Sequence, residues 1–321
     1  MPAGRHRLVT VVAAILVGAL VALQSRINAE LAHYVGSGLV AAAISFGTGL
    51  VLAWGILASR APLRTAMAAL PSIVRSGRLK WWHVLGGLGG AWLVTTQGLV
   101  VPSVGVTAFT VGVVAGQVSG SLLVDRAGLS PAGRLPVDAR RVLAAGVALT
   151  AVVVSGLHAG IGAVTWIVLL AVSAGFGIAV QQAINGRVAS VSGEAMVATG
   201  VNFIVGFTAL ALVSGIALGS GAISMGSLPS QWWLYLGGPI GVAFIALAAW
   251  AVRGGGVLIF GLLSIAGQLL GSVVMDVVAP TGTTGFGWSQ WTSLALVMLA
   301  VLIATNPGAR RLDGSRVATV D

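Results

Sequence analysis

The chain has 321 residues, of which 57% are hydrophobic and only 7% are charged, whereas an ordinary soluble domain has about 25% charged residues. This composition excludes a soluble globular fold and indicates an all-α integral membrane protein. The formal net charge is +10, but the basic residues lie in short segments between apolar runs, which does not favour a nucleic-acid partner. The chain has no cysteine, which excludes disulfides and thiolate metal sites.

Uncharged runs predict ten transmembrane helices, because one bilayer crossing takes about 20 residues of helix. Segments rich in Gly, Pro and Ser divide the longest runs, for example VPSVG at 101–105 and GSGAISMGSLPSQ at 219–231. In chain order, the expected spans are 8–28, 36–58, 83–101, 105–124, 141–157, 163–185, 195–218, 232–252, 255–275 and 290–306. The segment 60–80 is interpreted as a basic loop.

The distribution of basic residues predicts the orientation. If the N-terminus is cytoplasmic, every Lys and Arg except Arg26 falls in a cytoplasmic loop or tail, as the positive-inside rule requires. Both termini are therefore expected in the cytoplasm.

The chain repeats itself. Five residues recur 157 positions later, and another set recurs 151 positions later. The first set is Gln24, Ile27, Asn28, Phe46 and Gly49, and the second is Trp81, Trp82, Gly86, Gly87, Gly90 and Phe109. The longest match pairs AGQVSGSLLVD at 115–125 with AGQLLGSVVMD at 266–276. We interpret the chain as two five-span repeats, 1–157 and 158–321.

Five spans are an odd number, so the second repeat must cross the membrane in the opposite sense to the first. Inverted repeats are typical of secondary transporters, in which two similar halves expose one site to each side in turn. The glycine pairs Gly116/Gly120 and Gly267/Gly271 form GxxxG motifs, which favour close helix contact.

These motifs carry a family resemblance. Two five-span units, each with Gln-x-x-x-Asn in the first span and Ala-Gly-Gln-x-x-Gly-Ser-x-x-x-Asp in the fourth, resemble the YdcZ-like branch of the drug/metabolite transporter superfamily. The resemblance implies an exporter of a small metabolite or drug-like molecule in a bacterial-type inner (cytoplasmic) membrane. Small multidrug-resistance relatives use a glutamate in the first helix for proton coupling, but 8–28 has no acidic residue, so that coupling is not carried over.

Depth within the spans suggests the substrate contacts. A side-chain amide facing lipid would remain unpaired at a cost of several kcal/mol, so amides near the midplane should face a cavity or another helix. We expect substrate contacts at Gln117, Gln268, Ser45, Asn202 and Gln97. The alternative is that these side chains form hydrogen bonds between helices.

A second group of polar residues is expected at the two ends of the path. Gln24 and Asn28 share a helical face and lie about 25 Å along the helix from Leu8, near the outer surface. Inversion would place Gln181 and Asn185 near the inner surface. Asp276 should accompany the first pair, and Asp125 the second. The alternatives are helix caps and ordinary boundary carboxylates.

Two other functions remain open. A membrane-embedded enzyme acting on lipids would need nucleophiles or metal ligands, but the four histidines have no metal-binding spacing. We therefore expect no enzyme, no cofactor and no metal site. A non-transporting membrane scaffold is the second alternative. The preferred hypothesis is a secondary transporter with a small-molecule substrate, working by alternating access within the lipid bilayer.

Overall fold

The computed structural model describes residues 2–129, 133–134, 138–156, 163–255, 257–279 and 287–305. This part of the chain consists of helices and connecting segments, without strands. In chain order the elements are α1 (Pro2–Val35), α2 (Gly38–Ser59), α3 (Ala61–Arg75), η1 (Trp81–Gly86), α4 (Gly87–Ala127), α5 (Ala139–Gly156), α6 (Ala163–Ser192), α7 (Ala195–Gly219), η3 (Trp232–Leu236), α8 (Gly237–Gly255), α9 (Val257–Val278) and α10 (Trp288–Thr305). The all-helical prediction is confirmed.

Within the described residues, five helical segments are long and apolar enough to cross a membrane, and three shorter apolar helices accompany them. The longest segment, Trp81–Ala127, contains two of the expected spans. It breaks at Gly105, whose backbone adopts φ 83° and ψ 168°. The break falls at the VPSVG segment, but the count of ten spans stays a prediction.

The structure differs from the expected spans at the ends of α1 and α6, the latter reaching Ser192 rather than 185, and in the segment 60–80. α1 runs on to Val35 rather than ending at 28, because Leu31, Ala32 and Val35 continue its buried face. The expected loop at 60–80 contains the amphipathic helix α3, whose Leu63 and Leu70 are buried against a cluster that includes Val188 of α6 and Val197 of α7. Basic charge concealed this helix in the sequence, since it is too short and too charged to span a bilayer.

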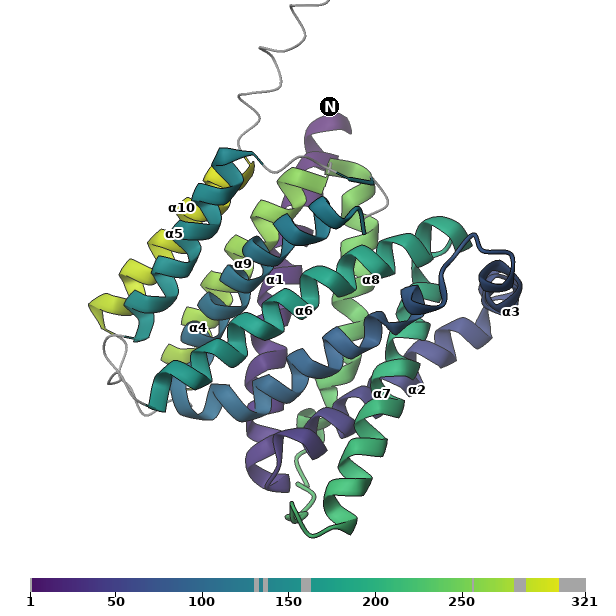
Figure 1. Cartoon of the computed structure of the whole chain (residues 1–321), viewed down its shortest axis with the longest axis horizontal. Coiled ribbons are helices and arrows are strands. Elements are labelled where there is room, and N and C mark those ends of the chain that lie inside the picture. The colour runs from purple at the N-terminus through teal and green to yellow at the C-terminus, as the bar shows by residue number, and fades with distance from the viewer. Residues whose placement is uncertain are drawn as a thin grey trace, which may run out of the picture.

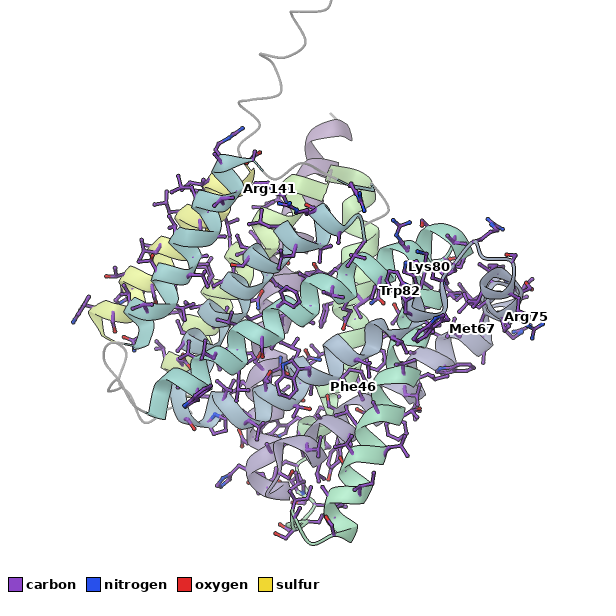
Figure 2. The ribbon with its side chains drawn as sticks, viewed as in Figure 1. Phe46, Met67, Arg75, Lys80, Trp82 and Arg141 are labelled. Carbon is purple, nitrogen blue, oxygen red and sulfur yellow. The ribbon has the colours of Figure 1, made fainter. Side chains whose placement is uncertain are left out.

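The predicted repeats are interleaved. α4 packs along α6, and α1 packs along α9 and α8, so the first helix of each repeat lies against the fourth helix of the other. Figure 1 shows α5 and α10 paired at one margin, α2 and α7 at the opposite side, and α3 at the periphery beyond them. In Figure 2, Arg75 lies on the outer side of α3, and Met67 lies nearer the bundle.

Glycines make these crossings possible. A Cβ added at Gly116 of α4 would collide with the backbone carbonyl of Val172 in α6, and one added at Gly267 of α9 would collide with that of Ile15 in α1. The GxxxG motifs therefore serve close helix contact, as predicted. The outer faces of the bundle carry exposed apolar side chains such as Val51, Val153 and Leu212, as contact with lipid requires.

Arg26, which departs from the positive-inside pattern, has local partners. It forms an ion pair with Glu30 one turn along α1 and donates from Nε to the carbonyl oxygen of Ala279, 3.0 Å away, at the end of α9. Its charge is thus balanced by a carboxylate and by the negative end of a helix dipole.

Candidate functional site

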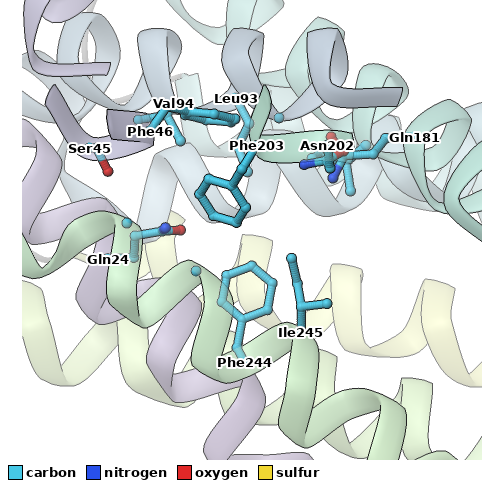
Figure 3. A pocket seen from close by; sticks show the side chains of 14 residues that line it. Gln24, Ser45, Phe46, Leu93, Val94, Gln181, Asn202, Phe203, Phe244 and Ile245 are labelled. Carbon is cyan, nitrogen blue, oxygen red and sulfur yellow. The ribbon is translucent and has the colours of Figure 1, made fainter. Parts of the chain in front are cut away.

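A cavity lies where the two predicted repeats meet (Figure 3). The empty space in and around it is about 390 Å³, which includes open solvent at its mouth. Most of its lining consists of pairs of residues that occupy equivalent positions in the two repeats. These pairs are Gln24/Gln181, Ser45/Asn202, Phe46/Phe203, Gly90/Gly241, Leu93/Phe244 and Val94/Ile245. The cavity therefore lies on the pseudo-symmetry axis that relates the repeats.

The expected separation of the Gln-x-x-x-Asn motifs is wrong. Gln24 and Gln181 both line this one cavity instead of marking opposite ends of the bundle. The reason is the length of their helices. α1 continues to Val35 and α6 to Ser192, beyond the expected ends at 28 and 185, which moves the middle of each helix toward its glutamine.

Each asparagine of the motif packs against the other repeat. A Cβ added at Gly86 would lie 2.5 Å from Oδ1 of Asn185, and one added at Gly237 would collide with Oδ1 of Asn28. The conspicuous Gly-Gly pairs after each Trp-Trp thus provide room for the asparagine of the opposite repeat. This cross-repeat contact explains why both motifs occur twice.

A buried hydrogen-bond network surrounds the Gln24 side of the cavity. Gln24 donates from Nε2 to the carbonyl oxygen of Gly237 at 2.7 Å. Asn28 donates to Oε1 of Gln97 at 2.6 Å, and Gln97 donates to Oγ of Ser25 at 2.9 Å. Gln97 is fully buried and is not among the lining residues, so its observed contacts are those of the helix-packing alternative.

The network on the Gln181 side is less complete. Asn185 donates to Oδ1 of Asn202 at 3.1 Å, which is a contact within one repeat. Oε1 of Gln181 and Oγ of Ser45 are buried without a hydrogen-bond partner. A buried unpaired polar atom costs about 1–3 kcal/mol, so these two oxygens are positioned to bind a guest molecule or water.

Gln117 and Gln268 do not line this cavity. They follow the glycines at which helices cross, and a Cβ added at Gly175 or Gly18 would meet the backbone nitrogen of Gln117 or Gln268, respectively. Their neighbourhood is therefore the α4–α6 and α1–α9 contacts. Depth in the membrane alone did not indicate which way these residues face.

The carboxylate of Asp276 caps a broken helix. Its two oxygens accept hydrogen bonds from the backbone N–H groups of Val106 and Thr107, each at 2.7 Å, directly after the break at Gly105. A carboxylate at a helix N-terminus satisfies free donors and complements the helix dipole. This contact joins α9 of one repeat to α4 of the other.

Asp125, the equivalent residue in the first repeat, forms an ion pair with Arg141 of α5. Nearby, Arg187 donates to the carbonyl oxygens of Gly128 and Leu129 at the end of α4, at 2.7 and 2.8 Å. Both aspartates of the repeated motif thus have structural partners. Within the described residues, no group of three His, Asp or Glu side chains could hold a metal ion.

Sequence analysis missed the aromatic part of the site. Phe46 and Phe203 have ring centroids 5.1 Å apart at an interplanar angle of 44°, and Phe244 lies opposite Phe203 (Figure 3). The recurrence of phenylalanine 157 positions apart was visible in the sequence. It was evidence for the repeat, and the same recurrence could have indicated residues on the symmetry axis.

The lipid-facing exterior, the interleaved helices and the cavity between repeated units define the class: a multi-pass membrane protein of the transporter type. A family model described as "Putative inner membrane exporter, YdcZ" matches residues 9–154 and 166–303, once in each repeat. The chain belongs to this family, and the predicted resemblance is confirmed. It is accordingly a multi-pass protein of the inner membrane.

Comparison with other proteins adds support for the fold. A solved structure described as "Crystal structure of protein" is similar to this chain, with a TM-score of 0.51 and 21% sequence identity. The alignment covers 94% of this chain and 97% of the chain in that structure. This similarity concerns the fold alone. No curated protein matches the chain.

Proposed function

We propose that the protein is a secondary transporter that exports a small molecule by alternating access, with the central cavity as its substrate site. The observation that carries this proposal is the location of the cavity on the pseudo-symmetry axis. A site on such an axis faces both halves of an inverted-repeat carrier equally, so rocking one half against the other can open it to either side.

Hydrogen bonds between the two repeats favour a conformation in which one end of the helix bundle is closed. We call the end with the α1–α2 turn and the α7–η3 connection the turn end. There, the backbone N–H of Gly226 donates to the carbonyl of Val35 at 3.0 Å, and Gln231 donates to the hydroxyl of Tyr34 at 3.2 Å. The Asp276 cap and the Arg26–Ala279 bond also join the repeats. By the predicted orientation, the turn end is outside.

The opposite end has fewer such contacts within the described residues. The bonds from Arg187 to α4 join the repeats there. We therefore propose that this conformation is closed toward the outside and that loading occurs from the cytoplasm. Rupture of the turn-end contacts would complete the transport cycle.

The test is flux through the purified protein in liposomes. Compounds from a metabolite and drug library that raise its melting temperature are loaded into proteoliposomes and followed across the membrane. We expect saturable flux, with a decrease of at least tenfold in a Gln24→Leu/Gln181→Leu variant. Gln182→Leu, which changes the exposed neighbour of Gln181, is the matched control and should retain flux.

Other outcomes of this experiment would favour one of the two alternative functions. Compounds that bind but never cross the membrane would contradict transport and support the scaffold function. Chemical conversion of a bound compound would support a membrane-embedded enzyme.

A further inference from the structure

We propose that the central cavity selects an uncharged molecule with a flat apolar body that carries a hydrogen-bond donor. This inference rests on the proposed function for the reason that a molecule enters the cavity. It adds the chemical class of that molecule, and three features of the lining carry it.

The first feature is charge. Among the described residues that line the cavity, none is Asp, Glu, Lys, Arg or His. The two aspartates of the repeated motif have other partners, since Asp276 caps α4 and Asp125 pairs with Arg141. An ion in this apolar site would lose its hydration without gaining a counter-charge, and such a transfer is costly. The cavity thus discriminates against both cations and anions.

The second feature is shape. Phe46 and Phe203 present tilted rings to the cavity, and each ring lies close to a glycine of its own repeat. A Cβ added at Gly90 would come within 3.1 Å of Cζ of Phe46, and one added at Gly241 within 3.3 Å of Cζ of Phe203. The glycines leave room for the rings, which form flat apolar walls. Flat walls favour a flat guest, because aromatic rings pack by offset stacking or edge contact.

The third feature is the state of the polar atoms. Gln24 already donates to Gly237, and Oδ1 of Asn202 already accepts from Asn185. In the described part of the lining, the buried side-chain atoms without partners are Oγ of Ser45 and Oε1 of Gln181. A guest N–H or O–H would satisfy Oε1 of Gln181, which can only accept, whereas the Ser45 hydroxyl can either accept from the guest or donate to it. Figure 3 shows Ser45 and Gln181 on opposite sides of the rings, so a body with a donor at one end and a polar group at the other would fit.

A matched series of probes tests this class directly. Indole-3-acetamide, tryptamine and indole-3-acetate share one aromatic body but are neutral, cationic and anionic, respectively, at pH 7. We would measure their dissociation constants for the purified full-length protein by calorimetry. We expect binding of the neutral amide, with affinities for both charged analogues at least tenfold weaker. We expect the Gln181→Leu variant to bind the amide about tenfold more weakly, because it loses one buried hydrogen bond. The Gln182→Leu variant should bind the amide unchanged.

Several results would overturn the proposal: no binding of the neutral amide, equal or tighter binding of a charged analogue, or equal effects of the two glutamine variants. Calorimetry requires no translocation, so failures of the two proposals are distinguishable. Binding of the amide without flux would reject transport and retain the chemical class of the site. Flux of a charged compound without binding of the amide would retain transport and reject the proposed chemical class.

Discussion

At the scale of single residues, the repeated motif serves both structure and access. The aspartates and glycines of the Ala-Gly-Gln-x-x-Gly-Ser-x-x-x-Asp motif hold helices together, while the glutamines of the Gln-x-x-x-Asn motif reach the cavity. Asp276 illustrates the structural part, because its carboxylate satisfies two backbone donors of the other repeat at the break after Gly105. The positive φ of Gly105 is readily adopted by glycine alone, and a Cβ there would lie 3.1 Å from both carboxylate oxygens.

We predict that Asp276→Ala destabilises the fold by about 2 kcal/mol, since it removes a charged acceptor from two helical N–H groups. The measurement is thermal unfolding of the purified protein. Glu194→Ala is the matched control, because Glu194 occupies the N-cap position of α7 but its side chain makes no capping hydrogen bond. Equal losses of stability in the two variants would mean that the Asp276 cap does not specifically stabilise the fold.

At the scale of helices, packing depends on backbone contact at glycines. Gly116 lets α4 approach α6 so closely that a Cβ would overlap a backbone carbonyl, which cannot rotate away as a side chain could. Gly146 in α5 has open space around the position of a Cβ. The two positions therefore separate the cost of lost packing from the intrinsic helix propensity of glycine.

We predict that Gly116→Ala destabilises the protein by about 1–3 kcal/mol through overpacking, whereas Gly146→Ala is neutral or stabilising by up to about 1 kcal/mol, because alanine favours helix. Unfolding of each variant in the same detergent, followed by circular dichroism, gives the comparison. A stable Gly116→Ala variant would show that α4 and α6 can separate without cost.

The sequence predicted helices, repeats and family because these depend on apolar length and on recurrence along the chain. Its substrate contacts stay a prediction, of which Ser45 and Asn202 line the cavity, because a site depends on depth and direction. The midpoint of α1 shifted once the helix was found to continue to Val35, which brought Gln24 to the cavity. Gln117 and Gln268 illustrate direction, since each follows a glycine at a helix crossing and no local signal shows which neighbour it faces. The amphipathic helix α3 was hidden by its charges.

At the scale of the whole molecule, the remaining prediction is orientation in the membrane. Apart from Arg26, which is paired locally, the basic residues belong to the end opposite the turn end by the positive-inside rule. Ser76 follows α3 on the basic end, and Ser220 follows α7 on the turn end, and both are exposed. The natural chain lacks cysteine, so a single introduced thiol reports one position.

We expect Ser220→Cys to react with a membrane-impermeant maleimide in intact cells, because the turn end should face outward. Ser76→Cys should react only after the membrane is permeabilised. The unmodified chain, which has no thiol, is the background control. Labelling of Ser76→Cys in intact cells would reverse the orientation. The closed turn end would then face the cytoplasm, and this conformation would be closed toward the cytoplasm instead of the outside.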